Sequence, residues 1–148
     1  EDTMIKSFRG KLAPAQIKRI KLGTIRGEIG YTIKKFQLIS TVPGESGKSV
    51  EYVGKLYSIE PPTADAAVNF DDPTLLGVVH LQDQHSADNP ASQVIIFDNV
   101  KFNQDIYVTL ADADGDTVEG NYYVELEQHR LSLNESTVAT LKDMRGRE

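Results

Sequence analysis

Alternation of apolar and polar residues with a period of two runs through most of this 148-residue chain. The clearest case is the stretch Tyr122-Tyr123-Val124-Glu125-Leu126-Glu127, in which Tyr122, Val124 and Leu126 share one parity. Because successive side chains of a β-strand point to opposite faces of a sheet, this stretch predicts a strand with one buried face.

Six further segments are predicted strands on the same grounds: residues 17–22, 31–38, 50–59, 75–81, 93–97 and 105–110. The apolar parity switches at Lys34 and Lys35, where a β-bulge or a strand edge would restore the inward face. The apolar run Val94-Ile95-Ile96-Phe97 has the length of a buried strand. It falls far short of the ~20 residues that a helix needs to span a bilayer.

Turn signals separate these segments at short intervals: Gly44-Glu45-Ser46-Gly47, Pro61-Pro62, Asp71-Asp72-Pro73, Ala87-Asp88-Asn89-Pro90 and Asp114-Gly115. Short alternating strands with such turns predict an all-β fold, an antiparallel β-sandwich that is jelly-roll-like, with at most one short C-terminal helix. That helix would follow the N-cap residues of Asn134-Glu135-Ser136-Thr137, although β-branched Val138 and Thr140 fit an extended segment equally well. We expect an N-terminal arm over 1–16, a β-sandwich domain over 17–133 and a C-terminal tail over 134–148.

Charge is distributed unevenly along the chain. Residues 1–60 hold 11 Lys and Arg against 6 Asp and Glu, whereas residues 61–129 hold 1 against 13. Two interpretations stay open: solvated faces, or a bipolar surface that docks against copies of itself or a lattice neighbour. Nucleic-acid binding is disfavoured, because the net charge is −6 and few aromatics accompany the basic residues. The absence of Cys excludes a disulfide scaffold and thiolate chemistry, and it suits synthesis in a reducing cytoplasm.

Asp112, Asp114 and Asp116 resemble a calcium loop at first sight. An EF-hand loop starting at Asp112 needs Gly at its sixth position and Glu at its twelfth, where Thr117 and Tyr123 stand instead. Asp114-Gly115 is a favoured hairpin pair, so a plain hairpin is the preferred interpretation and a loose calcium site the alternative.

Other residues that carry chemistry do not form a recognisable site. The histidines His80, His85 and His129 have no spacing that forces three or four zinc ligands to converge. Gly47-Lys48-Ser49 matches the end of a phosphate-binding loop, but Val42 stands where its first glycine belongs. We therefore expect no catalytic residue, no cofactor and no metal, and we do not expect an enzyme.

The six tyrosines allow two interpretations, a sugar-stacking platform or packing within the sheets. Packing is preferred, because tyrosine is a good strand former and the chain has no Trp. The stretch Phe97 to Thr109 is rich in Asp and Asn, and we interpret it as a scaffold corner. Asp98-Asn99 and Asn103-Gln104-Asp105 turn the chain there, and Phe97 and Phe102 anchor it.

Five segments resemble small structural proteins of marine tailed bacteriophages: Ile5 to Gly10, Ile95 to Asn99, Phe102 to Thr109, Tyr122 to Glu127 and Thr137 to Arg145. The resemblance implies a non-enzymatic virion component, a head decoration (cement) protein with a β-sandwich or jelly-roll body. It also implies assembly with itself, a trimer by analogy, and with the major capsid protein. Nucleic acid and membrane are not expected as partners, because the chain is acidic overall and its apolar runs are too short to span a bilayer. The alternatives are a carbohydrate- or receptor-binding module of a tail or fibre, and a tail or connector component. The family pattern contributes no functional residue, and Glu1-Asp2-Thr3 before Met4 leaves the native start open.

Apolar residues near both ends are candidates for contacts with neighbouring subunits: Ile5, Phe8, Leu12, Val138, Leu141 and Met144. The alternative is that both segments fold back onto their own sandwich.

Overall fold

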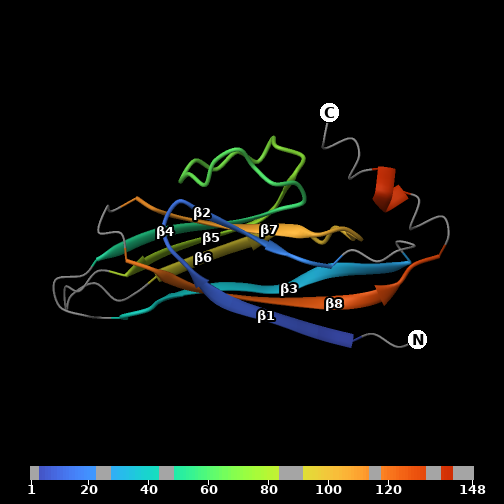
Figure 1. Ribbon diagram of the computed structural model, residues 1–148, viewed down its shortest axis with the longest axis horizontal. Coiled ribbons are helices and arrows are strands. Elements are labelled where there is room, and N and C mark those ends of the chain that lie inside the picture. Colours follow the sequence, from blue (N-terminus) through green and yellow to red (C-terminus); the bar gives the residue numbers. More distant parts are fainter. Residues whose placement is uncertain are drawn as a thin grey trace.

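Two antiparallel β-sheets pack face to face and appear as two layers in Figure 1. The structure is a computed structural model that describes residues 4–22, 28–43, 49–83, 92–113, 118–132 and 138–141. Its strands are β1 (Met4–Leu12), β2 (Gln16–Ile20), β3 (Ile29–Ser40), β4 (Val50–Tyr57), β5 (Leu75–Asp83), β6 (Ser92–Phe97), β7 (Ile106–Asp112) and β8 (Gly120–Arg130). The predicted all-β antiparallel sandwich is confirmed.

The strand orders are β1-β8-β3 in the smaller sheet and β2-β7-β4-β5-β6 in the larger one. A jelly roll wraps an antiparallel ribbon of eight strands, whose pairs would be β1–β8, β2–β7, β3–β6 and β4–β5. Three of these pairs are present, but β6 pairs with β5 and not with β3. The finer expectation of a jelly roll is therefore not confirmed.

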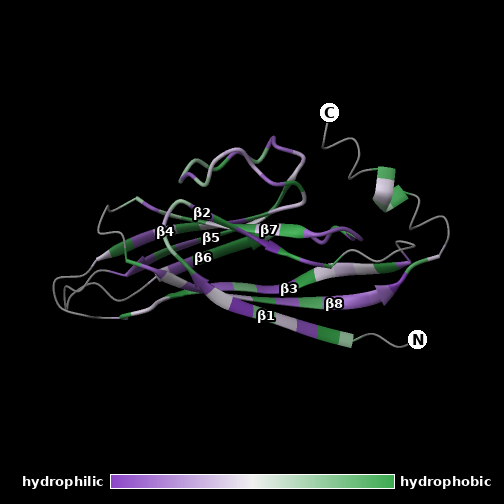
Figure 2. Ribbon diagram, viewed as in Figure 1, coloured by the Kyte–Doolittle hydropathy of each residue, from purple (hydrophilic) through white to green (hydrophobic). Residues whose placement is uncertain are grey.

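The N-terminal segment belongs to the sandwich, so the expected arm over 1–16 is wrong for residues 4–12. Strand β1 pairs with β8 from Met4 opposite Gln128 to Leu12 opposite Gly120. Phe8 packs against the core and Leu12 is buried within it. Pairing with β8 also satisfies backbone groups that a free arm would leave to water. Only the first residues of β1, which are green in Figure 2, present apolar side chains to solvent.

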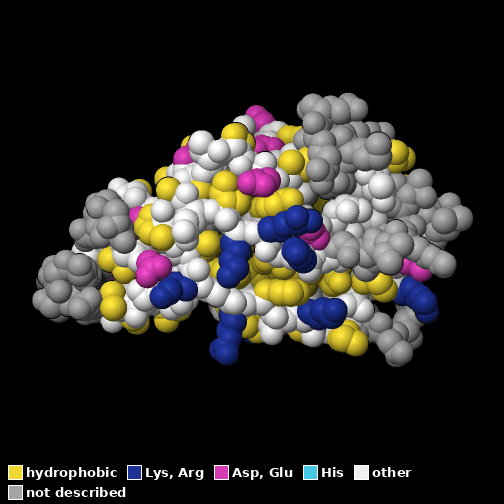
Figure 3. Space-filling view, viewed as in Figure 1, with side chains coloured by type: hydrophobic (Ala, Val, Ile, Leu, Met, Phe, Trp, Pro, Cys, Tyr) yellow, Lys and Arg dark blue, Asp and Glu magenta, His cyan; other side chains and the backbone are white. Residues whose placement is uncertain are grey.

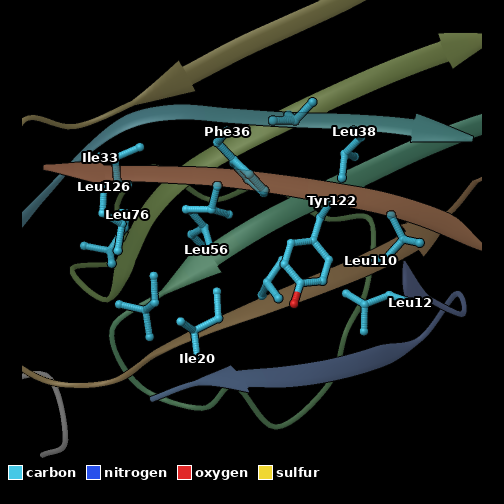
Figure 4. Packing of buried hydrophobic residues seen from close by; sticks show 14 of the residues in the cluster. Leu12, Ile20, Ile33, Phe36, Leu38, Leu56, Leu76, Leu110, Tyr122 and Leu126 are labelled. Carbon is cyan, nitrogen blue, oxygen red and sulfur yellow. The ribbon is translucent and has the colours of Figure 1, made fainter. Parts of the chain in front are cut away.

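The core lies between the sheets and is built by the inward parity of each strand. Phe36, Leu38 and Tyr122 from the smaller sheet meet Leu56 and Leu110 from the larger one (Figure 4). Four of the six tyrosines are buried, namely Tyr31, Tyr52, Tyr57 and Tyr122, as the packing interpretation predicted.

The predicted irregularity at Lys34 and Lys35 is confirmed as a shift in the register of β3 against β8, between Ile33 and Lys35. The shift lets Ile33 and Phe36 both face the core, while the two lysines stay exposed. The bulge thus lets apolar residues before and after it face the same side of the sheet, although they differ in parity.

The outer face of the five-stranded sheet is covered by residues 58–74, which lie over it in Figure 1. Val53, Tyr57, Leu75 and Val78 form a second apolar cluster on this face. The segment is ordered by turns in which Asn69 Oδ1 accepts from Asp71 N at 3.0 Å and Asp72 Oδ1 accepts from Thr74 N at 2.9 Å.

The described part of the C-terminal tail, residues 138–141, is a helical turn. Ala139 is buried, and Asn103 Nδ2 donates to Thr140 Oγ1 at 3.1 Å, so the turn packs on its own sandwich. Val138 and Leu141 remain exposed. The expected N-cap residues at 134–137 and Met144 lie outside the described residues.

Candidate functional site

The Asp- and Asn-rich stretch from Phe97 to Thr109 forms the predicted scaffold corner. Phe102 and Tyr31 stack with ring centroids 6.2 Å apart, and their backbones exchange hydrogen bonds of 2.8 and 3.0 Å. Asn103 is buried, with only 1% of its surface exposed. The corner therefore ties β3 to the segment that leads into β7.

Asp105 carries the electrostatics of that corner. Its Oδ1 accepts from the backbone N–H of Leu22 at 2.6 Å, and its Oδ2 accepts from Arg19 Nε at 2.6 Å. A second guanidinium nitrogen of Arg19 also contacts Oδ2. The hydrogen bond from Arg19 to Asp105 raises the pKa of the guanidinium above its ordinary value. Two guanidinium nitrogens on one carboxylate oxygen, with the Leu22 N–H on the other, fix the end of β2 against the start of β7.

The histidines within the described residues do not converge. His80 Nε2 lies 3.2 Å from Glu51 Oε2, while His129 Nε2 lies 3.1 Å from both Thr32 Oγ1 and Glu127 Oε1 on the other sheet. His85 lies outside the described residues. Across the described ranges, no group of three or more His, Asp or Glu is arranged to hold a metal ion.

The hairpin and phosphate-loop candidates are described only in part. Asp112 Oδ1 accepts from the backbone N–H of Glu51 at 3.1 Å, which joins β7 to β4. Asp114 and Asp116 lie outside the described residues, as do Gly47 and Lys48. The choice between a plain hairpin and a loose calcium site therefore stays a prediction.

The uneven charge along the chain is partly matched within one molecule. Ion pairs join Lys11 to Glu119, Lys34 to Glu127 and Lys55 to Asp65, each a cation from residues 1–60 and an anion from residues 61–129. Arg19 and Asp105 form a further ion pair of this kind. Strand order explains the pairs of Lys11 and Lys34, because β1 and β3 flank β8. On the face seen in Figure 3, Lys and Arg side chains still gather where β1 and β2 lie.

A groove of about 780 Å³ lies on the outer face of the three-stranded sheet, towards one end of it. Two cross-strand rows line it: Arg9, Tyr123 and Gln37 in one row, and Lys11, Asn121 and Ile39 in the other. Directly opposed residues share a face of the sheet, so these six side chains are presented together.

The groove combines an aromatic ring, amides and two cations. Tyr123 Oη donates to Glu125 Oε2 at 2.9 Å, and this hydrogen bond raises the pKa of the phenol. Gln93, which also lines the groove, bonds to the edge of β3: its Oε1 accepts from Leu38 N at 3.3 Å and its Nε2 donates to Leu38 O at 3.2 Å. Sequence reasoning missed this groove, because its rows form only once the strand register is known.

The apolar run Val94-Ile95-Ile96 is exposed, contrary to the expectation of a buried strand. The exposed fractions are 55%, 36% and 50%. Strand β6 is an edge strand of the five-stranded sheet, and its last residue, Phe97, packs partly against the core. Phe70, 66% exposed, lines a second groove together with Ile96 and Phe97. These residues, Phe70, Val94, Ile95 and Ile96, are called the β6 patch below.

No family model and no curated protein matches the chain. Within the described residues, no helix has the length and apolar content needed to cross a membrane.

Proposed function

We propose that the chain is a non-enzymatic structural protein of a virion, a capsid decoration protein that stabilises the head of a tailed bacteriophage. It would bind other copies of itself and the major capsid protein. The proposal rests on the resemblance stated above together with the exposed apolar surface of the sandwich.

The β6 patch is the observation that carries the proposal. Contiguous exposed apolar surface marks interaction sites in soluble proteins. Ile5 on β1, with Val138 and Leu141 on the C-terminal turn, adds exposed apolar side chains near the chain ends. A capsid lattice offers neighbours that would cover such surfaces.

The polar contacts described above serve the scaffold. Asp105 holds Arg19 and the backbone of Leu22, and buried Lys55 holds residues of the covering segment 58–74. The histidine contacts likewise join neighbouring strands. These roles fit a protein whose task is rigidity.

Imaging of intact particles tests the proposal. Particles of the encoding phage, labelled through an affinity tag on the chain, should carry label over the head. Label restricted to the tail or its fibres would support the receptor-binding alternative. Label at the head–tail junction would support a connector component. The absence of label from purified particles would contradict every virion assignment.

A second candidate function is favoured by the groove on the three-stranded sheet. Tyr123 offers a ring for stacking against a sugar, and Asn121, Gln37 and Arg9 offer hydrogen-bond donors around it. The volume lies in the usual range of about 300–1,000 Å³ for small-molecule sites. A carbohydrate- or receptor-binding module would use this face.

Glycan-array binding followed by titration calorimetry separates the two functions. A glycan-binding module should bind a defined glycan and lose at least about fivefold in affinity on Tyr123→Ala, since a stacked aromatic contributes about 1–3 kcal/mol. Ile5→Ala, at an exposed site on the same sheet, is the matched control. Lack of binding to any glycan would leave the decoration function as the stronger proposal.

A further inference from the structure

The four strands at the edges of the two sheets are β1, β3, β2 and β6. Three of them carry cations that discourage pairing with another chain: Lys6, Arg9 and Lys11 on β1, Lys34 and Lys35 at the bulge of β3, and Lys18 and Arg19 on β2. Strand β6, Ser92–Phe97, carries no charged residue. It is therefore the one edge among the described strands that lacks this protection.

The hydrogen-bond pattern between β5 and β6 shows which backbone groups of β6 point away from β5. Asp98 N donates to Leu76 O at 3.0 Å, which makes this pair a hydrogen-bonded one in the antiparallel register of β5 and β6. Hydrogen-bonded and non-hydrogen-bonded pairs alternate along such a ladder. It follows that Gln93, Ile95 and Phe97 direct their backbone N–H and C=O groups away from β5. No described strand pairs with that side of β6.

The side chains of β6 are apolar on both faces of the sheet. Val94 and Ile96 lie opposite His80 and Val78 and point to the outer face, next to the second apolar cluster. Ile95 lies opposite Val79 and points inward, where it is still 36% exposed. Figure 1 shows β6 beside β5 at the end of the five-stranded layer.

We propose that β6 pairs with β6 of a second copy of this chain, antiparallel and centred on Ile95, to form a ten-stranded sheet across a two-fold axis. In this register Ile95 faces the partner's Ile95, and Gln93 faces the partner's Phe97. The outward N–H and C=O groups of Gln93, Ile95 and Phe97 then all form hydrogen bonds with those of the partner copy. Registers shifted by two residues lose pairs at the ends of the strand.

The same register matches the side chains. Val94 of one copy stands opposite Ile96 of the other on the outer face, and apolar cross-strand pairs stabilise sheets. No like charges are opposed, because neither strand carries a charge. Phe70, which lines a groove with Ile96, extends the apolar surface beside the junction.

The contact is isologous, so it closes after two copies. It therefore predicts a dimer where the resemblance implies a trimer. A strand pair of five residues, Gln93 to Phe97, buries little area, so we expect a weak, reversible dimer. The inference concerns the isolated chain and goes beyond the proposed location on a virion.

Cysteine cross-linking tests the register, and the natural chain has no cysteine to interfere. Opposed Cα atoms of a hydrogen-bonded antiparallel pair lie about 5.5 Å apart, within the range of a disulfide. Ile95→Cys should give a disulfide-linked dimer under mild oxidation. Val94→Cys is the control, because the two copies of this residue stand on a diagonal about 7–8 Å apart.

The control is also more exposed than the test site, at 55% against 36%, so random collision would favour it. We expect Ile95→Cys to cross-link at least about tenfold faster. Equal rates, a faster reaction of Val94→Cys, or no dimer from either variant would overturn the proposal.

Sedimentation of the unmodified chain supplies the second measurement, at roughly 10 µM to 1 mM, the range of weak interfaces. A monomer–dimer equilibrium is expected, and Val94→Lys with Ile96→Lys should shift it to monomer by opposing lysines across the junction. Ile39→Lys, on an equally exposed residue of β3, should leave it unchanged. Circular dichroism establishes that each variant folds. A trimer, a monomer at every concentration, or a dimer insensitive to the double variant would overturn the proposal, even if the protein is found on particles.

Discussion

The side-chain amide of Gln93 on β6 takes the place of a strand along the edge of β3, because it both accepts from and donates to the backbone of Leu38. The two hydrogen bonds measure 3.3 and 3.2 Å. An ideal jelly roll would pair β6 with β3 here. One side chain thus joins the two sheets where the backbone ladder is missing.

Gln93→Ala removes both hydrogen bonds and should lower the free energy of unfolding by about 0.5–1.5 kcal/mol. Urea denaturation measures this as a lower midpoint at constant slope. Gln37→Ala is the control, because Gln37 is exposed on the outer face of β3 and should stay within about 0.5 kcal/mol of the parent. Equal midpoints for all three proteins would show that the bridge does not stabilise the fold.

Lys55 is a buried cation, with 1% of its surface exposed, and it anchors the segment that covers β4, β5 and β7. Its Nζ donates to Asp65 Oδ1 at 3.0 Å and to Ala67 O at 2.6 Å. The hydrogen bond from Lys55 lowers the pKa of Asp65 below its ordinary value. A lowered pKa means that this stability is present above the unfolded pKa and is lost as pH falls through the folded one.

Asp65→Asn should therefore destabilise the protein at pH 7 by about 0.2–1 kcal/mol, since it removes the negative charge that faces Lys55 and solvent screens the half-exposed carboxylate. The difference from the parent should shrink as pH falls below the unfolded pKa of about 4 and through the lowered pKa of folded Asp65. Asp71→Asn, on an exposed residue of the same segment, is the control. A difference that stays constant from pH 7 to pH 3 would contradict this account of Lys55.

Ala15, in the turn between β1 and β2, has a φ of 69°, in the left-handed region that disfavours residues with a Cβ. Its N–H donates to Leu110 O at 2.7 Å, which holds the turn against β7. Ala15→Gly should raise the free energy of unfolding by about 0.5–1 kcal/mol through relief of this strain. Thermal unfolding measures it. Ala13→Gly, at a position with no positive φ, should be neutral or destabilising, and a gain from Ala13→Gly alone would contradict the turn geometry.

Tyr52 is fully buried, and its hydroxyl donates to the carbonyls of Val118 at 2.6 Å and Glu119 at 2.8 Å. Burial raises the pKa of the phenol to about 12. A raised pKa means that its stability is complete below the unfolded value of about 10 and is lost as pH rises towards 12. Melting temperatures from pH 8 to about 12 should fall more steeply for the parent than for Tyr52→Phe. Parallel curves would show that Tyr52 does not govern the alkaline limit.

The sequence predicted seven of the strands from their apolar residues and missed β1, whose apolar parity is too weak to read. In β1, Phe8, Gly10 and Leu12 share the inward face, but Gly10 adds no apolar signal. That glycine is required by packing, because a Cβ there would lie 2.9 Å from the ring of Tyr122. The bulge at Lys34 and Lys35 was predictable, since a parity switch has few other solutions.

Burial was harder to predict than strand content, because it depends on strand order. The apolar run Val94-Ile95-Ile96 is typical of a buried strand. It is nevertheless exposed, because β6 lies at the edge of its sheet. Lysine is usually a surface residue, yet Lys55 is buried beneath residues 58–74. The rows that line the groove likewise depend on the register of β8 against both neighbours.

The central claim is that this chain is a structural component of a phage head, and its copy number on the particle tests that claim most directly. Quantitative mass spectrometry of purified particles of the encoding phage measures the ratio of this chain to the major capsid protein. A decoration protein is predicted to be present in hundreds of copies, in a fixed ratio to the capsid subunit. A few copies for each particle, or none, would contradict the account.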